Sequence, residues 1–167
     1  MPVPEIAARA GVGTGTIYRF FVSKEALVNE LFREQKLALG RRLTRGLDET
    51  MEPRLLFREF WRRLVQFARE EPEAFRFLEL QDHLSYLDDE SRALEKKVLA
   101  PIVTATRALQ KRGVYRKELR PEIVMTLHWG AFVQLFKAER TGHLTLRSRD
   151  ITATCDAVWR MCTYEND

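Results

Sequence analysis

Hydrophobic residues recur at three- and four-residue steps over most of the chain, and no stretch alternates with the two-residue period of a strand. In the first third, this pattern predicts a short helix over residues 5–10, a second over 14–21, and a long third helix that follows Ser23. Gly11 is expected to end the first helix in a left-handed conformation, and the Ser23 side chain is expected to cap the third. The chain therefore begins with two short helices and one long one.

The remaining pattern predicts five further helices, over residues 53–71, 73–83, 88–112, 121–140 and 149–163. Pro101 is expected to kink the helix that contains it, because proline removes a hydrogen bond and pushes against the carbonyl of Lys97. The predicted fold is all-α. We expect residues 1–47 to form an N-terminal module with its connecting helix, and residues 48–167 to form the body.

Charge is distributed unevenly along the chain, whose net charge is +4. Residues 1–47 hold eight of the 28 Lys and Arg residues but four of the 24 Asp and Glu residues, so the excess positive charge lies in the first quarter. This distribution is typical of a module that faces a polyanion and is attached to a neutral body. From charge alone, a solvated basic helix explains it equally well.

Residues 5–21 carry the most informative motif. Ile6 and Ile17 supply apolar contacts between the two short helices, and the small side chain of Ala7 lets the helices cross closely. Together with the turn at Gly11, this is the pattern of a helix-turn-helix, in which the second helix enters the major groove of DNA. Paired short helices also occur without any DNA-binding role, so the motif alone is moderately specific.

The stretch EIAARAGVGTGTIYRFFVSKEALVNELF resembles the DNA-binding region of the tetracycline-repressor (TetR) family of transcriptional regulators. The resemblance rests on Ile-Ala before Ala-Gly-Val, then Gly-Thr-Ile-Tyr, an aromatic pair and Ser-Lys-Glu-Ala-Leu. It covers residues 3–32, and beyond them it is architectural. It implies an all-helical homodimer with an N-terminal module that binds double-stranded operator DNA. The larger C-terminal domain would bind a small-molecule effector, apolar or aromatic, that releases the repressor from its palindromic operator.

The family pattern places DNA contacts at seven residues: Thr14, Gly15, Thr16, Tyr18, Arg19, Phe20 and Lys24. Glycine permits a close approach of the backbone to DNA, and the first amides of a helix suit a phosphate. By the resemblance, Tyr18 and Lys24 contact phosphates, and Arg19 contacts a base edge or a phosphate. For Tyr18 the alternative is packing against the next helix.

Three positions depart from the family pattern. Gly13, Thr14 and Phe20 stand where the family often has serine, lysine, and histidine or tyrosine. These changes remove polar side chains that could extend to DNA. Phe20 can offer DNA only an apolar contact, such as one to a thymine methyl group.

The family also has a helix before this pair, whereas here Met1-Pro-Val-Pro leads directly into it. We expect the natural N-terminus to lie upstream, because the recognition segment keeps its groove-facing and core residues. The alternative is an all-helical dimer that binds a ligand or a protein and has lost DNA binding with its first helix.

The body is expected to enclose a pocket, an expectation that rests on the resemblance and on the aromatic helices. The candidate lining residues are Trp61, Leu78, Gln81, Tyr86, Ile102, Trp129 and Phe132. Ordinary core packing is the alternative for each of them. The last helix repeats apolar residues in a narrow seam typical of helix pairing. With the preceding helix it supplies the expected dimer interface: Ile151, Cys155, Val158, Cys162, Ala131 and Leu135.

The sequence gives no support for an enzyme, a cofactor or a metal site. It holds no serine-centred motif, phosphate loop or carboxylate pair. His83 and His128 lack a third ligand at a useful spacing, and His128 is expected to be a core residue. Cys155 and Cys162 are expected to be buried and reduced, and no apolar run is long enough to span a membrane. These features favour a soluble cytoplasmic protein.

Overall fold

The computed structural model describes residues 1–47, 50–80 and 84–164. Within these ranges the chain is helical and has no strand, apart from one isolated antiparallel bridge between Tyr115 and Thr163. The all-α prediction is confirmed. The elements are α1 (Val3–Ala10), α2 (Thr14–Phe20), α3 (Lys24–Thr44), α4 (Pro53–Glu70), α5 (Pro72–Phe75), the π-helix η1 (Arg76–Leu80), the 3-10 helix η2 (Leu84–Tyr86), α6 (Asp89–Lys111), α7 (Pro121–Arg140) and α8 (Ser148–Cys162).

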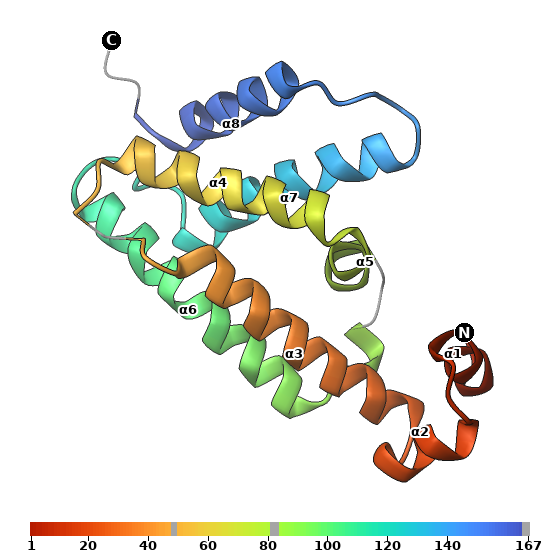
Figure 1. The fold of residues 1–167 in the computed structure, drawn as a ribbon. Helices are drawn as coiled ribbons and strands as arrows, with labels where there is room; N and C mark the ends of the chain where they lie inside the picture. Colours follow the sequence, from red (N-terminus) through yellow and green to blue (C-terminus); the bar gives the residue numbers. More distant parts are fainter. Residues whose placement is uncertain (48–49, 81–83, 165–167) are drawn as a thin grey trace.

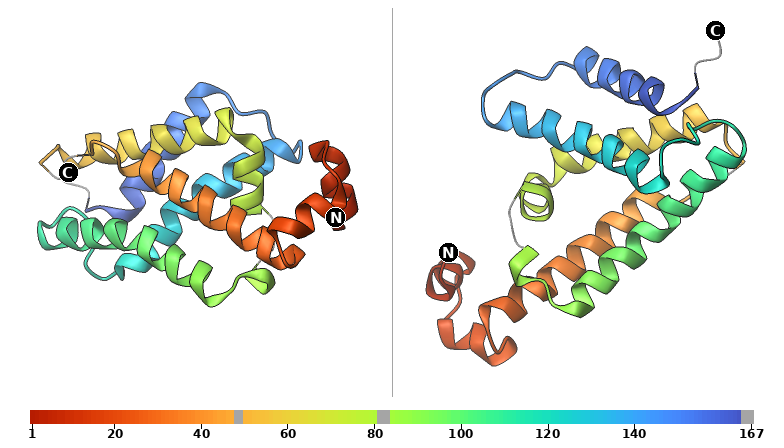
Figure 2. Two further views of the ribbon diagram at one scale, coloured as in Figure 1. Left: turned by 60° about the horizontal axis from the view of Figure 1, so that its bottom comes forward. Right: turned by 180° about the vertical axis from the view of Figure 1, so that it is seen from behind.

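Two long helices, α3 and α6, run side by side in the same direction (Figures 1 and 2). The helices α4, α7 and α8 pack together on one side of this pair. The short helices α1 and α2 lie beyond the start of α3, away from α4, α7 and α8 (Figure 2). A single long helix therefore connects the terminal module to the body.

The predicted helix ends at the front of the chain are confirmed. Gly11 follows α1 with φ +67°, in the left-handed region that glycine adopts without strain. Ser23 precedes α3, and its Oγ accepts a hydrogen bond from the Ala26 backbone N–H at 3.1 Å. This bond satisfies one of the amides that a helix start leaves unpaired. These local signals fix where α1 ends and where α3 begins.

The predicted helix over residues 73–83 is wrong in its details. It divides into the four-residue α5 and the π-helix η1, and residues 81–83 lie outside the described part of the chain. A π-helix widens the turn by one residue and shifts the side chains that follow on its surface. Here the widened turn contains Glu79.

The core of the body is built around Phe132 of α7, which is 0% exposed. Four aromatic rings surround it, with centroid distances between 5.0 and 5.9 Å: Trp61, Phe75, Trp129 and Phe136. Edge and tilted contacts of this kind are the arrangements that aromatic pairs prefer. They join α4, α5 and α7 into one unit.

Gly40 allows α3 and α6 to approach closely. A Cβ atom at this position would lie 2.8 Å from Cγ1 of Val98 on α6. Because a helical valine has one strongly preferred χ1 rotamer, the contact is relieved mainly by separating the helices. We expect Gly40→Ala to lower the free energy of unfolding by about 1–2 kcal/mol, measured by urea denaturation, despite alanine's better helix propensity.

The control is Gly130→Ala in α7. Gly130 also lies within a helix, but a Cβ atom there would meet no atom within 4 Å. This variant is expected to gain up to about 1 kcal/mol, the usual difference in helix propensity. Equal effects of the two substitutions would contradict the close approach of α3 and α6.

Candidate functional site

Most residues of α2 are exposed to solvent, and only Thr14 and Ile17 are half-buried. None of its residues is buried, whereas Val3 and Ala7 of α1 are. Tyr18 is 52% exposed and Phe20 is 72% exposed. A short helix with such a free face can contact another molecule without any rearrangement of the module.

The structure brings the seven predicted DNA-binding residues together on and just after α2. Five of them are exposed: Gly15, Thr16, Tyr18, Arg19 and Phe20. Thr14 is half-buried at the start of the helix. Lys24, also half-buried, points back to the body, with Nζ 5.2 Å from the centroid of the Tyr86 ring. A phosphate contact by Lys24 therefore requires its side chain to leave this ring.

A buried polar residue, Asn29, fixes the start of α3 to the body. Its Nδ2 donates to the carbonyl oxygens of Glu25 at 2.9 Å and Tyr86 at 2.7 Å, and its Oδ1 accepts from the Asp88 N–H at 2.9 Å. Asn29 is 3% exposed, so these bonds form without competition from water. Sequence reasoning missed it, although it stands at helical spacing among the core-facing positions of α3.

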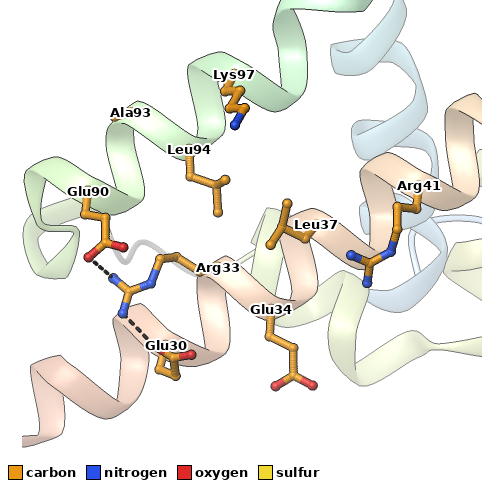
Figure 3. A pocket seen from close by; sticks show the side chains of 9 residues that line it. All are labelled: Glu30, Arg33, Glu34, Leu37, Arg41, Glu90, Ala93, Leu94 and Lys97. Carbon is orange, nitrogen blue, oxygen red and sulfur yellow. Dashed lines mark hydrogen bonds and ion pairs between the residues drawn. The ribbon is translucent and has the colours of Figure 1, made fainter.

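Arg33 makes a second connection between α3 and the start of α6 (Figure 3). Its guanidinium nitrogens lie 2.6 Å from Glu30, 3.3 Å from Asp88 and 3.5 Å from Glu90. Exposed pairs of this kind contribute little stability individually. Their geometry nevertheless places charged groups from both helices along one surface groove beside the module.

A cavity of about 710 Å³ lies between α3, α6 and α7, with contributions from α4 and η1. Two of the seven predicted pocket residues, Ile102 and Trp129, line it. A volume of this size is in the range of small-molecule sites. Its walls include Leu39, Gly40 and Leu43 of α3, so the helix that carries the module also forms part of the cavity.

The other predicted pocket residues lie elsewhere. Trp61, Leu78 and Phe132 are at most 5% exposed and belong to the core of the body. Tyr86 lies beside Lys24 at the start of α3, and Gln81 falls outside the described residues. Helical periodicity identified buried positions but could not separate a solid core from a cavity wall.

Three charged residues stand at one end of the cavity. Lys36 Nζ lies 3.2 Å from Glu79 and 3.3 Å from Glu95, and the indole N–H of Trp129 donates to Glu79 at 2.7 Å. Lys36 is 8% exposed. Burial raises the pKa of Glu79, because a carboxylate loses hydration there. The cluster links α3, η1, α6 and α7 through side chains.

His128 stands between this cavity and a second one of about 200 Å³. Its ring packs against Phe57 and Tyr115, with centroid distances of 4.8 and 5.6 Å. Burial lowers its pKa to about 4, so the imidazole is neutral at pH 7. His128 is half-buried and lines both cavities, and within the described residues its Nε2 has no hydrogen-bond partner, so it is a cavity-wall residue where a core residue was expected.

The predicted dimer seam of α8 faces its own chain. Cys155, Val158 and Cys162 are at most 4% exposed within one protomer. They pack among residues of α4, α6 and α7. The narrow apolar stripe of α8 is therefore buried in the core of its own protomer. Ile151, like Ala131 and Leu135 of α7, is half-buried. The exposed residues of α8 are Ser148, Arg149, Thr152, Ala153, Ala157, Arg160 and Met161.

The described residues contain no group of three His, Cys, Asp or Glu side chains that could hold a metal ion. No helix in the same ranges is long and apolar enough to cross a membrane.

Comparisons with known families match nearly the whole chain. Residues 1–31 match the family described as bacterial regulatory proteins, tetR family. Residues 32–163 match the family described as tetracyclin repressor-like, C-terminal domain.

Individual relatives agree with these matches. An uncharacterised HTH-type transcriptional regulator of Bacillus subtilis, YhgD, is 44% identical over 54 residues, which cover 32% of this chain and 26% of that protein. A TetR family transcription regulator from Marinobacter aquaeolei superimposes with a TM-score of 0.84 at 20% identity, over 99% of this chain and 86% of that one. A TetR-family regulator from Haemophilus influenzae gives 0.78 at 20% identity, over 98% and 86%. At these identities the two structures show a common fold.

Proposed function

The chain belongs to the tetracycline-repressor (TetR) family of transcriptional regulators, and we propose that it represses transcription as a ligand-responsive homodimer. Members of this family are DNA-binding transcription factors and not enzymes. In the proposed division, residues 1–47 form the DNA-binding module with its connecting helix, and residues 48–167 bind the effector and dimerise. The protein would act in the cytoplasm, where it meets its palindromic operator.

The observation that carries the proposal is the free face of α2. Tyr18, Arg19 and Thr16 are exposed together on a helix that buries none of its own residues. A helix that enters the major groove needs such a face, with long polar side chains for base edges and phosphates. We therefore assign the DNA contacts to Thr14, Gly15, Thr16, Tyr18, Arg19, Phe20 and Lys24.

The response to an effector would pass through α3. Its first residue, Lys24, follows the recognition segment, and further along the same helix Lys36, Leu39 and Leu43 line the cavity. A molecule that enters the cavity would press on α3 and tilt the module at its end. Because two modules must meet successive major grooves about 34–36 Å apart, a small tilt is enough to weaken binding. The apolar walls favour an effector with an apolar or aromatic body.

Dimerisation is proposed through α7 and α8. The predicted residues Ala131, Leu135 and Ile151 are half-buried in one protomer and remain available at the edge of such an interface. The exposed face of α8, which includes Ala153, Ala157 and Met161, replaces the buried seam as the proposed contact. Two protomers related by a two-fold axis would present their α2 helices to the two halves of a palindrome.

A mobility shift on the DNA that flanks the gene tests the proposal. The full chain is expected to retard one flanking fragment in the presence of excess unrelated DNA, and to elute as a dimer in size-exclusion chromatography with light scattering. Retardation of no flanking fragment by the folded protein would refute the proposed function.

Tyr18→Phe examines one contact in that complex. The hydroxyl group of Tyr18 lies on the exposed face of α2, where it can donate to a phosphate. Its removal is expected to cost about 1 kcal/mol per half-site, the usual contribution of one hydrogen bond. The measurement is the dissociation constant on the retarded fragment, by fluorescence anisotropy. An unchanged constant would assign Tyr18 to packing against the next helix.

A further inference from the structure

The charged end of the cavity carries an excess of negative charge. One cation, Lys36, stands between two carboxylates, Glu79 and Glu95, at 3.2 and 3.3 Å. With all three groups ionised, the cluster has a net charge of −1. The side chains of Lys36 and Glu79 are 10% and 9% exposed, so water compensates this charge poorly.

Glu79 is held toward the cavity by its surroundings. It lies in the π-helix η1, and Trp129 donates its indole N–H to one carboxylate oxygen while Lys36 contacts the other. Burial raises the pKa of Glu79, because two neighbours do not replace the hydration that its charged form loses. A second positive charge nearby would supply the compensation of negative charge that Lys36 alone does not provide.

Much of the remaining cavity wall is apolar. Leu39, Leu43, Val98, Ile102, Val103 and Met125 are among its lining residues. Of the other charged lining residues, Arg107 and Glu122 pair with each other at 3.1 Å. Lys96 is exposed to solvent. The uncompensated charge thus stands beside Lys36, at one end of a chamber whose wall is largely, though not wholly, apolar.

We propose that this cavity selects an organic cation with a bulky apolar body, whose positive charge pairs with Glu79 and Glu95. The inference rests on the proposed function, since it names the chemical class of the effector. The cation would compete with Lys36 for the same two carboxylates. Lys36 belongs to α3, so its loss of partners would loosen the connecting helix from η1 and α6.

An anionic ligand fits the cluster less well. To reach Lys36 it would approach two carboxylates that already lie within 3.3 Å of the same Nζ. Lys36 and Glu79 are largely shielded from water and Glu95 is 32% exposed, so the repulsion between like charges is only partly screened. The geometry therefore discriminates between ligands of equal size and opposite charge.

Two ions of nearly identical size and shape test the selection. Tetraphenylphosphonium and tetraphenylborate are titrated into the full chain, with tryptophan fluorescence as the signal, because Trp129 lines the cavity. We expect the cation to bind at least about ten-fold more tightly than the anion, a difference of about 1.4 kcal/mol. Equal binding of the two ions, or tighter binding of the anion, would overturn the proposal.

Two variants locate the binding site. Glu79→Gln keeps the shape and an acceptor for Trp129, and Glu95→Gln changes a side chain that is 32% exposed and is easier to replace without unfolding. Each is expected to weaken binding of the cation about ten-fold while the anion binds no more weakly than before. Glu34→Gln, on the exposed side of α3, removes the same charge and should change the binding of neither ion. Unchanged cation binding in both cavity variants would place the cation elsewhere and refute the inference.

A parallel measurement separates this inference from the proposed function. DNA binding is followed by anisotropy at saturating tetraphenylphosphonium. Cation binding that depends on Glu79, together with unaltered DNA affinity, would uphold the ligand class and refute ligand response. DNA binding with no charge selection in the cavity would refute the ligand class and leave the DNA-binding role intact.

Discussion

Phe132→Ala is expected to lower the free energy of unfolding by about 3–5 kcal/mol, the range for removing a buried aromatic side chain. Phe132 is 0% exposed and contacts four aromatic rings, so its neighbours cannot collapse into the space without losing their own contacts. Much of a domain's net stability is of this size, and the variant is expected to be partly unfolded at 37 °C. Urea denaturation followed by circular dichroism measures the loss, at a fixed protein concentration because dimerisation adds to stability.

Phe20→Ala is the matched control. It removes the same atoms from a side chain that is 72% exposed, so its effect on unfolding should stay within about 0.5 kcal/mol. A similar loss of unfolding free energy in both variants would mean that Phe20 is buried in solution, and it would contradict the exposure of α2.

Arg19→Ala is expected to produce the largest loss of DNA affinity among single changes in α2. The side chain is exposed on the proposed recognition helix, where it can reach a guanine edge or a phosphate. Truncation of such an arginine costs about 1–3 kcal/mol per half-site, and a dimer makes the contact twice. Fluorescence anisotropy on the retarded DNA fragment should therefore show a weakening of about 30-fold or more.

Arg62→Ala provides the comparison for this charge. Arg62 is an exposed arginine on α4 that pairs with Glu59 at 2.7 Å, far along the chain from the module. Its removal changes the net charge equally and should change DNA affinity less than about three-fold at 0.15 M salt, where distant charges are screened. If the two variants weaken binding alike, Arg19 acts through overall charge and makes no specific contact.

Local signals account for what the sequence predicted correctly. The period of the apolar residues identifies helices because each helix must bury one stripe, and Ser23 and Gly11 mark helix ends because their conformations satisfy unpaired backbone groups. The helix-turn-helix was recognisable for the same reason, since its turn, its small crossing residue and its exposed tyrosine lie within one short stretch.

The features that the sequence did not reveal depend on contacts between distant segments. The stripe of Cys155 and Val158 shows that one face of α8 is buried, but it does not tell whether the covering surface belongs to the same chain. The π-helix at Glu79 was not predicted from the local sequence, and the partners of that carboxylate lie in the distant helices α3 and α7. Asn29 and Lys36 were detectable in principle as polar residues at core-facing positions of α3.

The proposed function depends on sequence-specific DNA binding through α2. The most direct test compares the dissociation constant of the protein on the retarded flanking fragment with that on a scrambled duplex of equal length and composition, at one salt concentration. We expect a preference for the flanking fragment of at least about 1000-fold, as specific regulators show. Equal dissociation constants on the two duplexes would contradict it.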